Sequence, residues 1–457
     1  MQRRLRFVLL SLCSVGLLVL SAMPAAAGHS DDEHSQNMGL MSNTPRSSEQ
    51  VQSDLAFQGN LAFAGNYNGF RVMDVSSPAN PRVLADVWCP GPQNDISVWN
   101  DVIILSVDTV MASDECGAEP LEDRTDPSGW EGLRIFTLDE VLAAPADEDG
   151  FVHPQPVSTV YTDCGSHTHT GVPDGDRVLA YVSSYPARSG PTCGPENAEE
   201  FGYDPLHSQI SIVEVPLHQP ENAELLKTVP IDVPTWDLLE QFGFNPMQGC
   251  HDLQADMQTM LMAAACSSVG QVWDISDPEN PDTLNPLWEV NEPEVEFYHS
   301  ALFSEDRDVV VFGDESILQT CDDGSGSGQL WYYDRRTGEF LSSFQIDDEI
   351  GMYCSAHLFN NIPTHKGRYM VASWYNGGVR VIDYNDPTNP TQIGFYRPAP
   401  TDDPVRDEPV GHWAAYWYNG WIYANDMDRG FDIFRLSDPA RAGATKLPRL
   451  NPQTQEN

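Results

Sequence analysis

The stretch "GVRVIDYNDPTNP" at residues 378–390 decides the fold, because its strand and turn return along the chain. In each copy a short apolar strand ends in an aspartate, and a turn with prolines follows. Two other clear copies are "FRVMDVSSPANP" at 70–81 and "GQVWDISDPENP" at 270–281. The aspartate can accept hydrogen bonds from nearby backbone N–H groups and proline fixes φ, so each copy predicts a sharp turn between two strands. We therefore assign these motifs a structural role.

Weaker copies of this unit raise the number to seven. They are "GLRIFTLDE" at 132–140, "QISIVEVPLHQPENAE" at 209–224, "QLWYYDRRTGE" at 329–339 and "GFDIFRLSDPA" at 430–440. Most copies follow a pair of strands joined by Gly-Asn or Asn-Gly, as in "HWAAYWYNGWIYAND" at 412–426, and precede another short strand. This repetition predicts an all-β fold, a single seven-bladed β-propeller of four-stranded antiparallel blades over residues 51–450.

Closure of such a ring normally needs the first and last blades to share strands. Either "NMGLMSN" at 37–43 or "ATKLPRL" at 444–450 could complete blade seven, and the sequence does not choose between them. The residues beyond the repeats are mostly polar. We therefore predict a polar N-terminal segment over 28–50 and a polar tail over 451–457.

The chain resembles the LVIVD-repeat family of secreted or surface β-propellers, named for a strand motif that "VRVID" at 379–383 nearly spells. The resemblance extends over the repeats, and the motif that carries it is structural. It therefore implies a fold far more than an activity, because propellers host unrelated functions.

Residues 1–27 have the order of a secretory signal peptide: arginines, the apolar run "FVLLSLCSVGLLVLSAM" at 7–23, and small residues. We expect cleavage after Ala27 and a secreted, extracellular, monomeric protein without membrane insertion. The chain has 24 Lys and Arg against 68 Asp and Glu, a net charge of −44 at pH 7. Nucleic acid and anionic membranes are therefore poor partners, and we interpret the charge as a solvated acidic surface.

Eight cysteines follow the leader, an even number that predicts disulfides in an oxidising compartment. Neighbouring cysteines share blades and a face of the predicted propeller, so we predict pairing in sequence order. The expected disulfides are Cys89–Cys116, Cys164–Cys193, Cys250–Cys266 and Cys321–Cys354. These disulfides would hold the long insertions in place on the face where the inner strands begin, which is consistent with a preformed site there.

Five strand-like segments open with a histidine, and two earlier ones carry an aspartate at the matching place. The candidates for one ring around the central channel are His169, His251, His299, His357 and His412, with Asp54 and Asp95 as weaker candidates. Imidazoles that converge with carboxylates suit Cu, Zn, Fe or Ni. The open end of a channel would leave a coordination position for water or substrate. The pattern therefore predicts a transition-metal site.

Several further residues could support this ring. His167 lies two residues before His169 and is a candidate fifth ligand or general base. Candidates for orienting an imidazole, or alternatively for capping a loop, are Asp252, Asp314 and Asp426. Tyr298 and Tyr353 are candidates for lining a pocket. The other histidines are expected on the surface or in the tail: His29, His34, His153, His207, His218 and His365.

Two functions of different class fit this pattern. In the first, a metal centre serves an extracellular redox or hydrolytic reaction on a small molecule. In the second, a non-enzymatic binding module recognises a protein, a glycan or an envelope component through its stapled loops, and the histidines bond to their own blades. A calcium-dependent lactonase-like hydrolase fits less well, because calcium prefers oxygen ligands and imidazoles outnumber carboxylates here.

Overall fold

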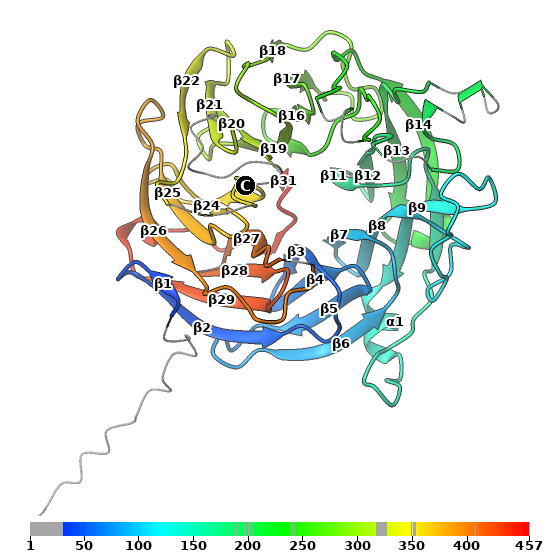
Figure 1. Ribbon diagram of the computed structural model, residues 1–457, viewed down its shortest axis with the longest axis horizontal. Coiled ribbons are helices and arrows are strands. Elements are labelled where there is room, and N and C mark those ends of the chain that lie inside the picture. The colour runs from blue at the N-terminus through cyan, green and yellow to red at the C-terminus, as the bar shows by residue number, and fades with distance from the viewer. Residues whose placement is uncertain are drawn as a thin grey trace, which may run out of the picture.

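Seven antiparallel sheets surround a central axis as the blades of a propeller (Figure 1). The computed structural model describes residues 31–187, 190–195, 198–199, 202, 204–238, 240, 243–316, 327–348, 350, 353–406 and 408–456. Each sheet contains four principal strands, and in six of the sheets these four follow one another along the chain. Three sheets contain a fifth strand. The predicted fold is confirmed. The predicted leader, residues 1–27, lies outside the described residues.

The blades follow one another in chain order, and the first strand of each lies nearest the axis. Blade one contains β3 (Gln52–Gln58), β4 (Leu61–Asn66), β5 (Gly69–Asp74) and β6 (Arg82–Trp88); blade two contains β7 (Gln93–Trp99), β8 (Val102–Met111), β9 (Trp130–Thr137) and β10 (Ser158–Tyr161). Blade three contains β11 (Thr168–Asp174), β12 (Arg177–Ser183), β13 (Gln209–Pro216) and β14 (Glu224–Pro230); blade four contains β15 (Leu253–Asp256), β16 (Leu261–Cys266), β17 (Val269–Asp274) and β18 (Trp288–Val290). Blade five contains β19 (Tyr298–Phe303), β20 (Val309–Asp314), β21 (Leu330–Asp334) and β22 (Phe340–Phe344); blade six contains β23 (Phe359–Asn361), β24 (Tyr369–Ser373), β25 (Val379–Asp383) and β26 (Thr391–Arg397). Blade seven contains β27 (His412–Tyr418), β28 (Trp421–Asp426) and β29 (Gly430–Leu436).

The N-terminal segment closes the ring. Strand β2 (Met38–Pro45) pairs antiparallel with β29 as the fourth strand of blade seven, and β1 (Glu33–His34) extends blade six beside β26. This resolves the choice between the two chain ends in favour of "NMGLMSN". Segment 28–50, expected outside the propeller, therefore contributes two strands, because the alternate residues Met38 and Leu40 bury apolar side chains between blades.

The C-terminal residues enter the ring instead of forming the expected solvated tail. Strand β30 (Arg449–Leu450) pairs with β3 of blade one, and β31 (Thr454–Gln455) pairs in parallel with β15 of blade four. Between them, the Asn451 side chain exchanges two hydrogen bonds with the Val98 backbone of blade two. Figure 1 shows this end of the chain in the middle of the ring. Polar side chains with specific partners thus hold the segment there.

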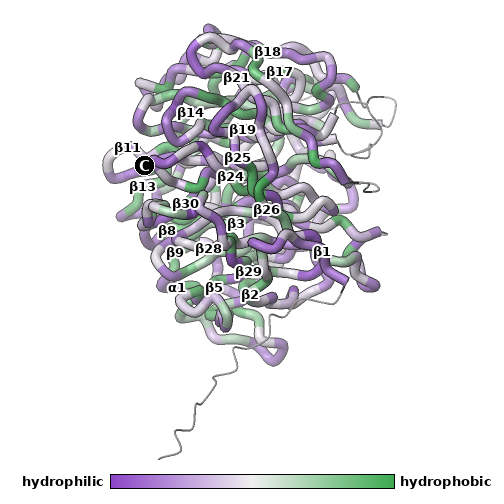
Figure 2. The backbone as a smooth tube through the Cα atoms, turned by 90° about the vertical axis from the view of Figure 1, so that its left-hand side faces the viewer, coloured by the Kyte–Doolittle hydropathy of each residue, from purple (hydrophilic) through white to green (hydrophobic). Residues whose placement is uncertain are grey.

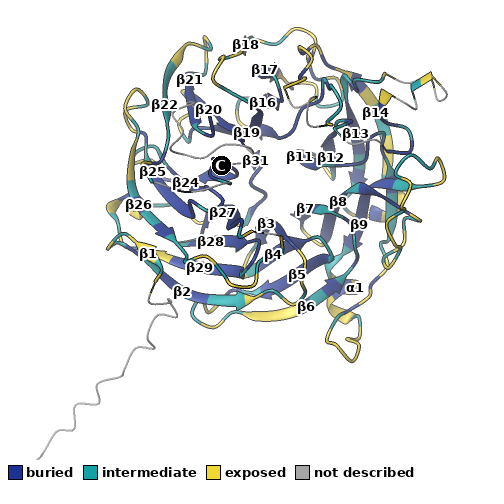
Figure 3. Ribbon diagram, viewed as in Figure 1, coloured by how far each residue is buried: buried dark blue, intermediate teal, exposed yellow. Residues whose placement is uncertain are grey.

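Apolar side chains join each blade to the next. Seven clusters of buried residues each span two adjacent blades, and one of them unites blades seven and one. In that closing cluster the ring centroids of Phe57 and Tyr418 lie 4.9 Å apart. The inner strands are buried while exposed residues lie toward the rim (Figure 3), and hydrophilic and hydrophobic residues alternate along the chain (Figure 2). Burial of these facing sheets is the main stabilising contribution to the ring.

The repeated aspartates cap the turns between the third and fourth strands, as predicted. Asp74 accepts a hydrogen bond from Ser76 N at 2.9 Å, Asp274 from Ser276 N at 2.7 Å, and Asp383 from Asn385 N at 2.9 Å. Short helices include α1 (Leu138–Ala143), η1 (Pro220–Asn222) and η3 (Pro439–Arg441). Within the described ranges, none of the helices has the length and apolarity that a membrane span requires.

Three of the four expected disulfides are present: Cys89–Cys116, Cys164–Cys193 and Cys250–Cys266. The fourth expected pair includes Cys321, which lies outside the described residues, while Cys354 is buried and disulfide-bonded. In each of the three pairs, the first cysteine precedes the innermost strand of the following blade. The disulfides therefore hold the approaches to the channel.

Candidate metal centre in the channel

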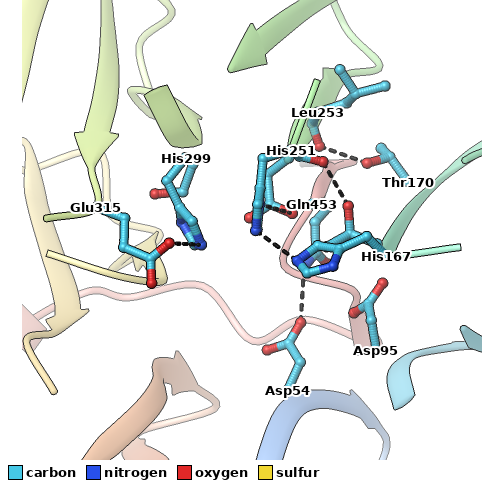
Figure 4. Close-up of polar contacts among 12 residues, drawn as sticks. Asp54, Asp95, His167, Thr170, His251, Leu253, His299, Glu315 and Gln453 are labelled. Atoms are coloured by element: carbon cyan, nitrogen blue, oxygen red, sulfur yellow. Dashed lines mark hydrogen bonds and ion pairs between the residues drawn. The ribbon is translucent and has the colours of Figure 1, made fainter. Parts of the chain in front are cut away.

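Three histidines from consecutive blades lie beside one another at the channel. His251 precedes β15, His299 lies on β19 and His357 precedes β23. Their ring centroids are separated by 3.7 Å between His251 and His299 and by 4.4 Å between His299 and His357. All three are at most 5% exposed. We call these residues the channel histidines; Figure 4 shows two of them.

Buried donor atoms in this group lack hydrogen-bond partners. His251 Nδ1 lies 3.7 Å from Asp252 Oδ1, which is too far for a hydrogen bond. Among the described residues, neither of these atoms nor His299 Nδ1 has a hydrogen-bond partner. One ligand atom from each of His251, Asp252 and His299 falls within 4.8 Å of the other two. Buried polar atoms are normally paired, so this set needs a specific explanation.

The tautomer of His357 directs a lone pair into the same group. Its Nδ1 lies 2.5 Å from the carbonyl oxygen of Trp413, which can only accept a hydrogen bond. His357 Nδ1 therefore carries the proton, and Nε2 of the neutral ring is free to act as a ligand. His357 forms a second compact group with His299 and Glu315, again with ligand atoms within 4.8 Å.

Glu315 enters the group from the residue after β20. Its Oε2 lies 3.5 Å from His299 Nε2, and its Oε1 accepts a hydrogen bond from the Tyr375 hydroxyl at 2.6 Å. The Tyr375 ring also lies 4.4 Å from that of His357. Tyr375 therefore fixes the carboxylate while one of its oxygens still faces the channel histidines.

His167 joins the group through a different geometry. Its Nδ1 donates to Asp108 Oδ2 at 2.5 Å, and its Nε2 lies 2.8 Å from His251 Nε2 (Figure 4). Burial lowers the pKa of His167, but Asp108, together with Asp252 and Glu315, raises it by more, so the net shift is upward. A carboxylate thus orients His167, which in turn contacts a channel histidine.

Electrostatics keep the channel histidines neutral. Burial, with help from neighbouring imidazoles, lowers the pKa of His251 and His299 well below the usual range and that of His357 to about 3. Burial and the charge of Asp95 raise the pKa of Asp252 to about 8. Neutral imidazoles are the form that binds metal, and a cation would favour the ionised form of Asp252.

Aspartates and the C-terminal segment border the remaining space. Asp54 accepts hydrogen bonds from the Tyr416 hydroxyl at 2.6 Å and from Gln453 Nε2 at 2.8 Å. Burial and Asp95 raise the pKa of Asp54 well above its usual range. Asp54, Asp95 and Gln453, together with the channel histidines, line a cavity of about 10 Å³. That volume is close to the minimum for one water-sized group.

The structure separates two of the predicted ring members from the channel histidines. His169 Nε2 lies 2.7 Å from Ser97 Oγ and His169 Nδ1 lies 2.8 Å from Ser106 Oγ, so both ring nitrogens bond to blade two. His412 lies inside blade seven, with Nε2 3.2 Å from Asp432 Oδ2. The predicted alignment of the inner strands, which placed His169 and His412 at the channel, is therefore off by one residue in blades three and seven. Thr168 and Trp413, one residue away, border the cavity instead, because successive side chains point to opposite faces of a strand.

Other expectations have mixed outcomes. Asp314 accepts three backbone hydrogen bonds and caps loops, and Asp252 lies beside His251. Tyr298 is buried between blades four and five, and Tyr353 packs against the cluster between blades seven and one. His153, His218 and His365 are exposed as expected, and His34 is an exposed residue of β1. His207 is instead buried and bonded to Ser184. His29 lies outside the described residues.

Sequence reasoning missed Glu315, Asp108, Tyr375 and Gln453. Glu315 directly follows β20 and Asp108 lies within β8, and both are hard to single out in so acidic a chain. Tyr375 reads as one more aromatic residue of the strands. Gln453 lies in what reads as a polar tail, and only its buried partner Asp54 reveals its place.

Comparisons with known proteins add no function. No family model and no curated protein matches the chain. Similar solved structures include a Bacteroides uniformis protein described as a candidate 6-phosphogluconolactonase, with 12% identity, 83% of this chain and 89% of that chain covered, and a TM-score of 0.49. Another is the β-propeller domain of Cps50 (Swd1) from Myceliophteria thermophila, with 8% identity, 87% and 99% covered, and a TM-score of 0.49. The description of the fold therefore rests on the sheet topology of this chain.

Proposed function

We propose that this chain is a secreted LVIVD-type propeller that binds a transition metal at the channel histidines and acts there on a small molecule. One observation supports the proposal above all others. His251 Nδ1, Asp252 Oδ1 and His299 Nδ1 are buried without hydrogen-bond partners among the described residues, and one ligand atom from each of these three residues lies within 4.8 Å of the other two. A cation bound by the three residues would give these buried side chains a partner.

The donor set fits a borderline metal. It offers imidazole nitrogens from the channel histidines and carboxylate oxygens from Asp252 and Glu315. Such mixed nitrogen and oxygen ligands suit Cu, Zn, Fe or Ni and do not suit Ca or Mg, which prefer oxygen shells. Glu315 is fixed by Tyr375, and His251 is contacted by His167, so supporting residues already orient the donors.

The enclosed space limits what can reach this site. A bound metal would supply Lewis-acid or redox chemistry to one water-sized group. The cavity of about 10 Å³ has room for little more, so a larger substrate would present one small functional group. His167, held by Asp108, could exchange a proton with His251 through the contact between their Nε2 atoms.

A non-enzymatic binding module is the second candidate. The three disulfides hold segments that lead into the inner strands of blades two, three and four, which favours a rigid loop face. They are also compatible with an oxidising, extracellular location. Such a module would recognise an extracellular protein or glycan through its loops and would not need the channel histidines.

Metal content separates the two candidates. The test uses untagged protein secreted in oxidised form, loaded with each metal, dialysed and measured by elemental mass spectrometry. His299→Gln should lose about one metal ion per chain relative to wild type, because it removes an imidazole shared by both ligand groups. The matched control is His169→Gln, a buried histidine whose ring nitrogens already have partners, and it should lose none.

The outcomes are distinct. Loss in His299→Gln alone supports the channel site, and turnover of oxidase or hydrolase substrates should then fail in the same variant. Equal metal content in folded wild type and folded His299→Gln contradicts the metal proposal. That result would favour the non-enzymatic binding module.

A further inference from the structure

A second group of buried donor atoms lies inside blade seven, away from the channel histidines. It consists of His412 at the start of β27, Asp426 at the end of β28 and Asp432 on β29. Each is at most 1% exposed, and one ligand atom from each lies within 4.8 Å of the other two. Gly411, with φ +87°, brings β27 against Tyr375, where a Cβ would lie 2.4 Å from the Tyr375 carbonyl oxygen. The backbone thus fixes the position of His412 at the start of β27.

The hydrogen bonds of this group leave two facing atoms unpaired. His412 Nε2 lies 3.2 Å from Asp432 Oδ2, and Asp432 Oδ1 accepts a hydrogen bond from Asn43 at 2.8 Å. If Nε2 carries the proton of the neutral ring, Nδ1 holds a lone pair. That atom faces Asp426 Oδ2 at 3.8 Å, and neither has a hydrogen-bond partner among the described residues. Two buried acceptors that face each other are unfavourable unless a cation or a hydrogen-bond donor lies between them.

We propose that His412 and Asp426 bind a divalent transition metal, such as Zn²⁺ or Mn²⁺, at a site separate from the channel. Asp432 orients His412 from behind, in the arrangement by which carboxylates commonly hold metal-binding imidazoles. In a tetrahedral shell with ligand bonds of about 2.0–2.2 Å, two ligand atoms lie roughly 3.3–3.6 Å apart. The separation of 3.8 Å between His412 Nδ1 and Asp426 Oδ2 is close to that range.

The surrounding charges also favour a cation. Asp426 and Asp432 are two buried carboxylates, and both of them, together with Asp32, raise the pKa of Arg429. When His412 is neutral and these acids are ionised, the carboxylates outnumber the guanidinium beside them. Asp428 is not available to the cation, because its oxygens accept hydrogen bonds from Val405, Val410 and Gly411.

A cavity provides the remaining coordination positions. Asp426 lies in the wall of a cavity of about 360 Å³ that is also lined by Tyr375, Arg397, Glu408 and Arg429. This volume lies in the range of small-molecule sites. Water or an oxygen-bearing ligand in the cavity could complete the coordination shell of a metal at its wall. The site therefore has both buried protein donors and an approach.

The experiment starts from His299→Gln, so that the channel and blade-seven sites are counted separately. After loading with Zn²⁺ or Mn²⁺ and dialysis, this variant should keep about one metal ion per chain, and His299→Gln with Asp426→Asn should keep none. Absence of metal from folded His299→Gln would overturn the blade-seven site while leaving the channel proposal intact. Retention of the metal after Asp426→Asn would overturn it as well.

Thermal unfolding in excess chelator gives a second, independent test of the same substitution. In Asp426→Asn the side-chain amide oxygen would still accept from the Asp428 and Arg429 backbone, and the new amide N–H could donate to His412 Nδ1. The substitution should therefore raise the unfolding midpoint of metal-free protein. If His412 is instead an imidazolium paired with both aspartates, the substitution removes an ion pair and the midpoint falls, which overturns the proposal. Asp438→Asn, at a surface cap, is the control for loss of one carboxylate.

Discussion

The channel histidines and His169 begin equivalent inner strands but meet opposite surroundings. His169 is enclosed by polar partners from blade two, namely Ser97, Ser106 and Asp95, at 2.7–3.1 Å. His251 and His299 each keep a buried nitrogen without a hydrogen-bond partner among the described residues. Both surroundings are almost completely buried. Burial alone therefore does not distinguish a structural imidazole from a candidate ligand, whereas the partners of its nitrogens do.

The difference arises from one step along a strand. In blade three the channel side is taken by Thr168, whose hydroxyl donates to the His251 carbonyl at 2.7 Å. His169, the next residue, points to the other face and bonds to the neighbouring blade. Substitution of His169 should therefore lower stability, whereas substitution of a channel histidine should lower metal content.

The largest expected effect is on stability, in His169→Leu. The substitution removes the imidazole that contacts Asp95, Ser97 and Ser106, while the backbone N–H of residue 169 still donates to Asp95. Burial raises the pKa of Asp95, but His169 together with Asp54 lowers it by more. Leaving a buried polar group without its partner typically costs about 1–3 kcal/mol, and three such groups lose a partner here. Denaturant unfolding should show this loss while metal content per folded chain stays unchanged. A fall in metal content at preserved stability would place His169 among the ligands.

A smaller effect, on pH dependence, is expected at His207, another histidine that bonds within the fold. Burial lowers its pKa from 6.5 to about 4, although Asp163 and Asp204 act in the opposite direction. Between about pH 4 and pH 6.5 the unfolded chain therefore binds more protons at His207 than the folded chain does. The stability that neutral His207 contributes is fully present above about pH 6.5 and is lost as the pH falls toward 4. The contribution is about 3 kcal/mol.

The measurement is the difference in unfolding free energy between wild type and His207→Gln across that pH range. Groups common to both proteins cancel in the difference, and Ser184 keeps a polar partner in the variant. The advantage of wild type should shrink as the pH falls from about 7 to about 4. A difference that stays constant with pH would show that His207 is not held neutral by burial.

The repeat was enough to predict the propeller because it encodes local chemistry. Asp74, Asp274 and Asp383 cap their turns through backbone groups only two residues away, so a sequence motif is sufficient to place them. Three disulfides were predictable for a related reason, since blade order brings neighbouring cysteines together. Closure by β2 was not predictable, because either chain end offered a plausible strand.

The candidate site was predicted only in part, because its composition depends on register and on long insertions. The alternation of side chains meant that a shift of one residue exchanged His169 for Thr168 and His412 for Trp413 at the cavity. Glu315 reaches His299 from a residue that follows β20, and Asp108 on β8 reaches His167, and neither acid belongs to the repeated motif. Gln453 reaches Asp54 across almost the whole chain, a contact that no local pattern can indicate.

The smallest expected effect tests the support behind the channel histidines. Asp108→Asn weakens the hold on His167, which contacts His251 through the two Nε2 atoms at 2.8 Å. Removing such a carboxylate behind a metal-site imidazole typically reduces metal affinity by about 10–100-fold, and the low end is expected because His167 acts on His251 indirectly. Competition with a chelator of known affinity would measure the change. Asp147→Asn is the matched control, since Asp147 pairs with the exposed His153 at 2.8 Å, and it should leave affinity unaltered. Equal affinities in all three proteins would mean that His167 and Asp108 take no part in holding the metal.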